Sequence, residues 1–142
     1  MLESVRVSIS EEIHSAEARR QALLLAQHLG FGRTDAYYLA TAVTELATNL
    51  FRHAGGGEIQ LRTLTRQNAV GIEVIAHDTG PGIANVEQAL REGFSTSGGL
   101  GCGLPGVRRL MDELEICSEM GRGTRIRACK WAAIIQTVER QC

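Results

Sequence analysis

Apolar and polar residues alternate along this chain in patterns that predict strands and helices. Residues 5–9 alternate apolar and polar side chains, which is typical of a strand with one buried face. Two longer segments, residues 11–29 and 35–54, have apolar residues at the three- and four-residue spacing of amphipathic helices. Because Thr34 and Asp35 both favour the N-cap position, we expect one of them to cap the second helix.

The second half of the chain predicts two hairpins with short helices between them. Each hairpin consists of two segments with the two-residue period of strands, joined by a short polar or glycine-containing turn. The strands are expected at residues 58–65, 69–78, 114–119 and 124–131, and the helices at 85–91 and 104–111. Strands that are joined by tight turns are antiparallel.

This order of elements predicts an α+β domain. The expected sheet is mixed but mostly antiparallel, and the helices should gather on one of its faces. Arg125 and Arg127 alternate with Ile126 and Ala128, so the other face of the sheet should be polar. We expect one domain over residues 1–131, followed by a C-terminal tail at 132–142 that resembles a frayed end more than a functional element and whose role the sequence leaves open.

Composition narrows the classes of function. The 142 residues are 44% hydrophobic and 22% charged with a net charge of −1, so they form an ordinary globular chain without the basic excess of a nucleic-acid binder. Lys130 is the only lysine, and no lysine follows the glycines as a Walker-type phosphate loop requires. The four cysteines have no metal-binding spacing. We see neither a signal peptide nor a membrane span, and we expect a cytoplasmic protein without membrane contact.

The second predicted helix has two stripes of different character. One stripe is apolar and should face the sheet, while the other aligns Thr41, Glu45, Asn49 and His53 at four-residue spacing. This polar stripe could be the solvated face of an ordinary amphipathic helix. Alternatively, Glu45 could accept a proton from an attacking hydroxyl, and the Asn49 amide oxygen could bind Mg²⁺, which prefers oxygen ligands.

A first glycine cluster follows the strand that ends at Asp78. The segment DTGPGI at 78–83 contains Gly80, Gly82 and Ile83, and Asp78 continues the core-facing row of that strand. A buried carboxylate needs a donor, and the exocyclic amine of adenine is one, whereas guanine presents an acceptor at the same place. The segment therefore indicates an adenine site, although the same residues also form a good turn in any protein.

A second glycine cluster indicates a loop that wraps phosphates. The segment STSGGLGCGLPG at 95–106 ends at Pro105, which suits the first turn of a helix, and amide groups at a helix N-terminus attract anions. Its candidate phosphate-binding residues are Ser95, Thr96, Gly98, Gly99, Leu100, Gly101, Cys102, Gly103 and Leu104.

These segments resemble a known superfamily. ELATN at 45–49, DTGPG at 78–82 and GGLGCG at 98–103 are similar to the three boxes of the GHKL ATPases and kinases, which include gyrase, Hsp90, histidine kinases and MutL. More narrowly, LGFG at 29–32, EGFSTSGGLG at 92–101 and GLPGVRRLMDE at 103–113 resemble the anti-sigma-factor serine/threonine kinases, in particular the switch kinases of stressosomes. The likeness extends from about residue 5 to 131.

The resemblance implies a two-layer Bergerat-type sandwich that binds ATP and Mg²⁺. It implies that Glu45 is the general base, Asn49 the Mg²⁺ ligand and Asp78 the acceptor for the adenine amine. It also places Gly80 and Gly82 in the floor of the pocket, Gly99, Gly101 and Gly103 in the phosphate lid, and Thr124 beside adenine.

Two functions follow from the resemblance. The first is a serine/threonine kinase that phosphorylates STAS-domain proteins and, once released, activates a downstream regulator such as a phosphatase. The second is a binding module that uses the nucleotide only as a switch. The catalytic half of a histidine kinase is disfavoured, because no helix pair with a phosphoacceptor histidine precedes the domain. The sequence leaves open whether the chain is a monomer or a homodimer.

Overall fold

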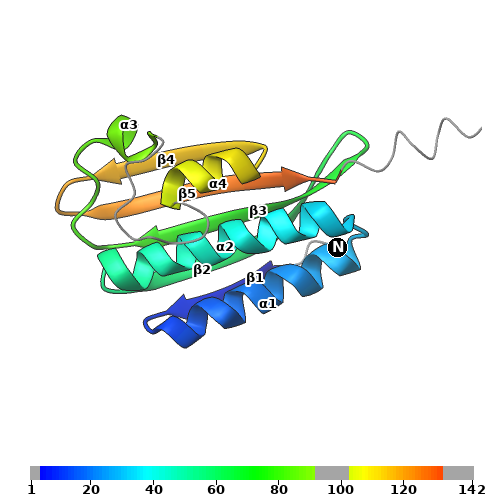
Figure 1. Ribbon diagram of the computed structural model, residues 1–142, viewed down its shortest axis with the longest axis horizontal. Helices are drawn as coiled ribbons and strands as arrows, with labels where there is room; N and C mark the ends of the chain where they lie inside the picture. The colour runs from blue at the N-terminus through cyan, green and yellow to red at the C-terminus, as the bar shows by residue number, and fades with distance from the viewer. Residues whose placement is uncertain (1–3, 92–102, 133–142) are drawn as a thin grey trace, which may run out of the picture.

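The computed structural model describes residues 4–91 and 103–132, which form a single five-stranded sheet with helices on one face (Figure 1). The strand order is β1-β2-β3-β5-β4, and each of the four pairings is antiparallel, so the described part of the sheet is not mixed. In chain order the elements are β1 Ser4–Ile9, α1 Glu12–His28, α2 Arg33–His53, β2 Gly57–Arg66, β3 Ala69–Asp78, α3 Val86–Ala89, α4 Gly103–Leu110, β4 Glu113–Glu119 and β5 Gly123–Trp131. The predicted α+β class and the two hairpins are confirmed.

The core lies between the sheet and the helices α1, α2 and α4. The predicted apolar stripe of α2 is buried as expected, and it consists of Ala36, Leu39, Val43, Leu46, Ala47 and Leu50. It packs in one core cluster with alternate residues of β2 and β3, namely Ile59, Leu61, Ile72, Val74 and Ala76. The long helix α2 is thereby fixed along the middle of the sheet. No helix among residues 4–91 and 103–132 is both long and apolar enough to cross a bilayer.

The start of α2 differs from the prediction. Neither Thr34 nor Asp35 caps the helix, because it begins at Arg33 with Gly32 as its N-cap. The preceding helix turns directly into α2: the Phe31 amide donates to the Ala26 carbonyl oxygen at 2.9 Å, and Phe31 itself is buried. Because Phe31 is held in this way, Gly32 is the single residue between it and the first turn of α2.

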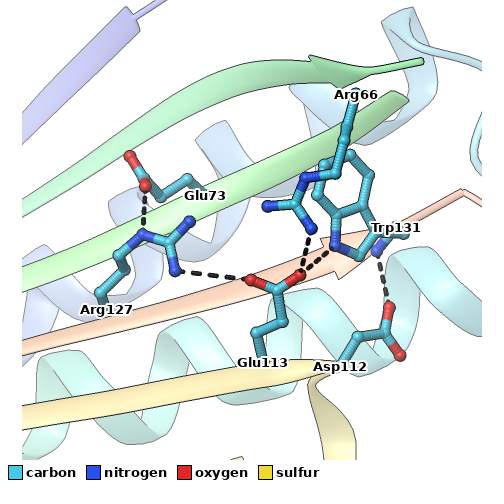
Figure 2. Close-up of polar contacts among 6 residues, drawn as sticks. All are labelled: Arg66, Glu73, Asp112, Glu113, Arg127 and Trp131. Carbon is cyan, nitrogen blue, oxygen red and sulfur yellow. Dashed lines mark hydrogen bonds and ion pairs between the residues drawn. The ribbon is translucent and has the colours of Figure 1, made fainter. Parts of the chain in front are cut away.

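The face of the sheet opposite the helices holds a network of charged side chains (Figure 2). Glu73 alternates with the core residues of β3, so its side chain points to this face of the sheet. Its carboxylate is almost fully buried there. Nη2 of Arg62 on β2 lies 2.6 Å from Oε1 of Glu73, and Nε of Arg127 on β5 donates to Oε2. An isolated buried carboxylate would be costly, so this pairing is what makes Glu73 tolerable at the centre of the sheet.

The network continues to Glu113 at the start of β4. Its carboxylate accepts hydrogen bonds from the Trp131 indole at 2.8 Å and from Arg66 at 3.1 Å, and Arg66 also stacks over the Trp131 ring. Nη1 of Arg127 lies 3.5 Å from the other carboxylate oxygen of Glu113 and forms an ion pair with it (Figure 2). These contacts, the Trp131 hydrogen bond above all, lower the pKa of the Glu113 carboxyl below its ordinary value.

The Glu113 contacts predict a specific pH dependence of stability. Because the folded-state pKa is lowered, the ionised carboxylate stabilises the fold above its ordinary pKa of 4.5, and this contribution is lost as the pH falls through the folded-state pKa. Glu113→Gln should therefore lower the free energy of unfolding by about 1 kcal/mol near pH 7, and the difference from wild type should vanish below the folded-state pKa. Urea unfolding across pH measures this. Glu115→Gln, an exposed change on the same strand, should have little effect at any pH.

Candidate functional site

A cleft opens between the C-terminal half of α2, the segment after β3 and the start of α4. Its cavity volume is about 330 Å³, which is in the range of small-molecule sites. The lining residues come from α2 and its C-cap, β3, the segment after β3, α3, α4 and β5: Leu46, Asn49, Leu50, His53, Ala54, Ala76, Asp78, Pro81, Gly82, Ile83, Ala89, Gly103, Leu104, Pro105, Thr124 and Ile126. Segments that are far apart in the sequence thus meet around one largely apolar cavity with a few polar groups.

Asp78 lies at the end of β3, directly opposite Thr124 of β5 in the sheet register. Its Oδ1 accepts a hydrogen bond of 2.8 Å from the Gly80 amide, which closes the turn. The side chain is half-buried and lines the cleft, so the carboxylate that closes the turn also faces the cavity. The turn interpretation and the binding interpretation of this segment are therefore compatible.

The two glycines of the first cluster have different surroundings. Gly80 does not line the cleft; a Cβ there would lie 2.9 Å from the Ala54 carbonyl oxygen, so this glycine lets the turn pack on the end of α2. Gly82 does line the cleft, has a φ of +85°, and a Cβ there would lie 2.6 Å from the Glu119 carbonyl oxygen. Both positions depend on the missing side chain.

Ser118 is a site residue that the sequence analysis missed. Its hydroxyl accepts a 2.7 Å hydrogen bond from the Ile83 amide, lies 2.8 Å from the Thr124 hydroxyl, and donates to the Gly123 carbonyl oxygen at 3.3 Å. It thereby joins the segment after β3 to the β4–β5 hairpin beside Asp78. A single serine near a strand end has no sequence pattern that distinguishes it from any other surface serine.

The polar stripe of α2 is not a solvated face along its length. Glu45 is only 8% exposed, and its Oε1 accepts a 3.1 Å hydrogen bond from the amide of Gly103 at the start of α4. One turn later Asn49 lines the cleft, and so does the exposed His53 at the end of the helix. The solvated-face interpretation is therefore wrong for Glu45, which is not among the lining residues of the cleft but is buried against the start of α4.

The start of α4 closes the cleft on the side opposite Asp78. Gly103, Leu104 and Pro105 all line it, and Gly103 has a φ of +66°. The other predicted phosphate-binding residues, namely Ser95, Thr96, Gly98, Gly99, Leu100, Gly101 and Cys102, lie outside the described residues. Among residues 4–91 and 103–132, no group of three or more His, Cys, Asp or Glu side chains could hold a metal ion.

The turn between β4 and β5 offers a matched pair of glycines for testing this geometry. A Cβ at Gly123 would lie 2.1 Å from the Asp78 carbonyl oxygen, whereas a Cβ at Gly121 meets nothing within 4 Å, although φ is positive at both. Gly121→Ala should therefore cost only the backbone strain of about 1 kcal/mol. Gly123→Ala should cost at least about 2–3 kcal/mol, because Asp78 must also move. Denaturant unfolding compares the two, and equal losses would contradict this account of the β3–β5 contact.

Comparisons with known proteins agree with this architecture. Residues 9–130 match the model of the family described as "Histidine kinase-like ATPase domain". The chain is 45% identical to the serine/threonine-protein kinase RsbT of Bacillus subtilis over 88% of its own length and 94% of the relative. It is 38% identical to the anti-sigma F factor of Caldanaerobacter subterraneus over 66% of its own length and 68% of the relative.

Two solved structures share the fold. The RsbU and RsbW domains of Rv1364c from Mycobacterium tuberculosis match with a TM-score of 0.63 at 16% identity, over 94% of this chain and 33% of that one. The mycobacterial sensor histidine kinase MprB matches with a TM-score of 0.52 at 18% identity, over 93% of this chain and 98% of that one. The chain therefore belongs to the histidine kinase-like ATPase family, and within it to the group that includes RsbT and the anti-sigma factors.

Proposed function

We propose that this protein is an ATP- and Mg²⁺-dependent serine/threonine kinase that phosphorylates STAS-domain proteins in the cytoplasm. In this role it is the switch kinase of a stressosome-type complex and binds a downstream regulator, such as a phosphatase, once it is released. The name of the Bacillus subtilis relative, a serine/threonine-protein kinase, supports the reaction. The STAS substrates and the regulator follow from the sequence motifs that resemble the switch kinases.

One observation supports the proposal above all others. Asn49 of α2, Asp78 at the end of β3 and Gly103 at the start of α4 line the same cavity, and Glu45 lies one helical turn from Asn49 with its carboxylate on the Gly103 amide. An amide ligand for a hard cation, an acceptor for a base amine and a helix start for phosphate are thus collected around one space.

Glu45 is the proton acceptor in this proposal. Its carboxylate lies at the N-terminal amide of α4, where the phosphate chain of a nucleotide would meet the helix. An incoming serine or threonine hydroxyl would transfer its proton to Glu45 as its oxygen forms a bond to the γ-phosphorus and the bond from that phosphorus to the bridging oxygen of ADP breaks. When bound, Mg²⁺ neutralises negative charge on the phosphates, with Asn49 as its side-chain ligand. The amide of Leu104 lies in the same first turn and is a further candidate for phosphate contact.

Asp78 selects the base. Its Oδ1 already accepts the Gly80 amide, and a carboxylate has further lone pairs with which to accept the adenine amine. Thr124 lies opposite Asp78 and contacts the Ser118 hydroxyl, which supports a role for Thr124 beside the same base. Guanine would present an acceptor oxygen to the carboxylate and be repelled. The apolar side chains of Leu50, Ala76 and Ile126 line the same cleft and would contact the ring.

The similarity to anti-sigma F factors supports a second function for the same site. In that function the chain is a nucleotide-gated module that binds a regulatory protein without significant turnover. A nucleotide in the cleft would bridge α2, β3 and α4, so its presence could set the affinity for a protein that contacts these elements. Whether the complex transfers phosphate separates the two functions.

Replacing the proposed base should separate chemistry from binding. Glu45→Gln keeps an oxygen that accepts the Gly103 amide but removes the basic carboxylate. It should slow label transfer from γ-³²P-ATP to a purified STAS-domain protein by about 10²–10⁴-fold, while calorimetry shows the same affinity for ATP. Glu12→Gln, an exposed change on α1 that lines neither the cleft nor any other cavity described here, is the control. A Glu45→Gln protein that transfers label at the wild-type rate would refute the role of Glu45. No transfer by the wild type, with an intact complex, would favour the binding module.

Asp78→Asn should weaken ATP binding and reduce the preference for adenine. The amide oxygen still accepts the Gly80 amide and so preserves the turn, but the charged acceptor for the base amine is lost. A lost hydrogen bond to a charged group costs about 1.5–3 kcal/mol, or roughly 10- to 150-fold in affinity. Calorimetric titration with ATP and with GTP in parallel measures the change. Unaltered discrimination between the two nucleotides would show that Asp78 does not contact the base.

A further inference from the structure

A second cavity lies on the other side of α3 and α4 from the cleft. It has a volume of about 590 Å³ and is lined by Val86, Glu87, Leu90 and Arg91 at α3, Arg108 of α4, and Leu114 and Ile116 of β4. We call it the α3–β4 groove. None of these residues has a role in the nucleotide site described above.

The groove runs along an open edge of the sheet. β4 is the last strand in the order β1-β2-β3-β5-β4 and pairs only with β5 among the described elements. In Figure 1 its outer side faces away from the rest of the sheet, with α3 near one end. Backbone amides and carbonyls on such an edge are a template for an added strand. β4 is short and has three glutamates among its seven residues, features that discourage unspecific pairing of an open edge. These glutamates alternate with Leu114 and Ile116 and therefore lie on the face of β4 away from the groove.

The floor of the groove is apolar. Leu114 and Ile116 alternate on β4 toward the helix side, and Val86 and Leu90 face them from α3. All four side chains are half-buried, so the core covers only part of each of them. An extended segment beside β4 would direct every second side chain toward this floor, which suits an alternating pattern with apolar residues on one side.

The rim of the groove is positively charged. Arg91 and Arg108 are both exposed, and neither guanidinium group forms a hydrogen bond or ion pair with any residue that the structure describes. On the opposite face of the sheet, in contrast, Arg62 and Arg127 are paired with the buried Glu73. Among residues 4–91 and 103–132, Glu87 is the only acidic side chain that lines the groove. The charge left on the rim therefore complements an acidic partner.

The groove is separated from the nucleotide cleft only by two short helices. Ala89 of α3 and Pro105 of α4 line the cleft, while Leu90 and Arg108 of the same helices line the groove. A protein bound in the groove is thus held beside the site of phosphoryl transfer. This position suits a docking contact for the protein that receives the phosphate.

We infer that the α3–β4 groove binds an extended acidic segment of the phosphoacceptor protein, whose side chains on the helix side of the sheet include apolar groups that contact Leu114 and Ile116 and, beyond them, carboxylates that pair with Arg91 and Arg108. The identity of this partner rests on the proposed kinase function. The groove is a recognition surface that fixes partner choice, separate from the residues that bind the nucleotide.

Charge reversal at Arg108 tests the inference. Arg108→Glu should raise the KM for a purified STAS-domain substrate by about tenfold, because an attractive contact becomes repulsive, and it should leave kcat and the affinity for ATP unchanged. Arg125→Glu, an exposed reversal on the other face of the sheet, is the matched control and should leave all three unchanged. Circular dichroism verifies that both variants are folded. Raising the salt concentration should reduce the difference between wild type and Arg108→Glu.

The affinity of the complex, measured by calorimetry without phosphoryl transfer, keeps this test independent of the kinase proposal. If the wild type transfers no phosphate but Arg108→Glu still weakens the complex, the kinase function fails and the groove remains the docking site. Equal affinities of Arg108→Glu and Arg125→Glu for the STAS-domain protein would overturn the inference. A changed oligomeric state of Arg108→Glu in sedimentation, with unchanged partner affinity, would also overturn it, because the groove would then join two copies of this chain.

Discussion

The close packing of the end of α2 on the end of β3 determines the geometry of the cleft. Two glycines make this contact possible. A Cβ at Gly57 would lie 2.4 Å from the His77 carbonyl oxygen and 2.8 Å from a methyl group of Leu50, and a Cβ at Gly80 would collide with Ala54. Any side chain at either position would push the helix away from the strand. Because neither glycine has a side chain, the helix and the strand pack closely enough for Asn49 and Asp78 to line one small cavity.

Periodicity in the sequence predicted which faces of the elements meet, but not how deeply each polar group is buried. The apolar stripe of α2 and the two hairpins followed from spacing alone, since burial of one face is what imposes that spacing. The stripe with Glu45 could not be distinguished from a solvated face, because its burial depends on α4, which comes 58 residues later in the chain. The N-cap at Gly32 was missed for a related reason: the connection is shortened by the burial of Phe31, which is a tertiary effect.

The site itself was only partly visible in the sequence. Asp78 and the first glycine cluster have recognisable turn chemistry, and Asn49 has a helical spacing to Glu45, so these positions could be selected in advance. Ser118 could not, because its importance comes from three partners on two segments that meet it only in the folded chain. The α3–β4 groove likewise has no sequence signature, since its floor and its rim come from three separate elements.

The route of the chain through the sheet has a consequence for how the cleft forms. The sheet residues that line it belong to different hairpins, β2–β3 and β4–β5, and the pairing that joins these hairpins sets Asp78 opposite Thr124, although the two residues lie far apart in the sequence. Such closure costs loop entropy and is repaid only when the whole core assembles. A partly folded chain with intact hairpins would lack this cavity. Any ligand of this cleft therefore binds the native state alone and stabilises the entire domain cooperatively, so ligand availability and the lifetime of the protein are thermodynamically linked.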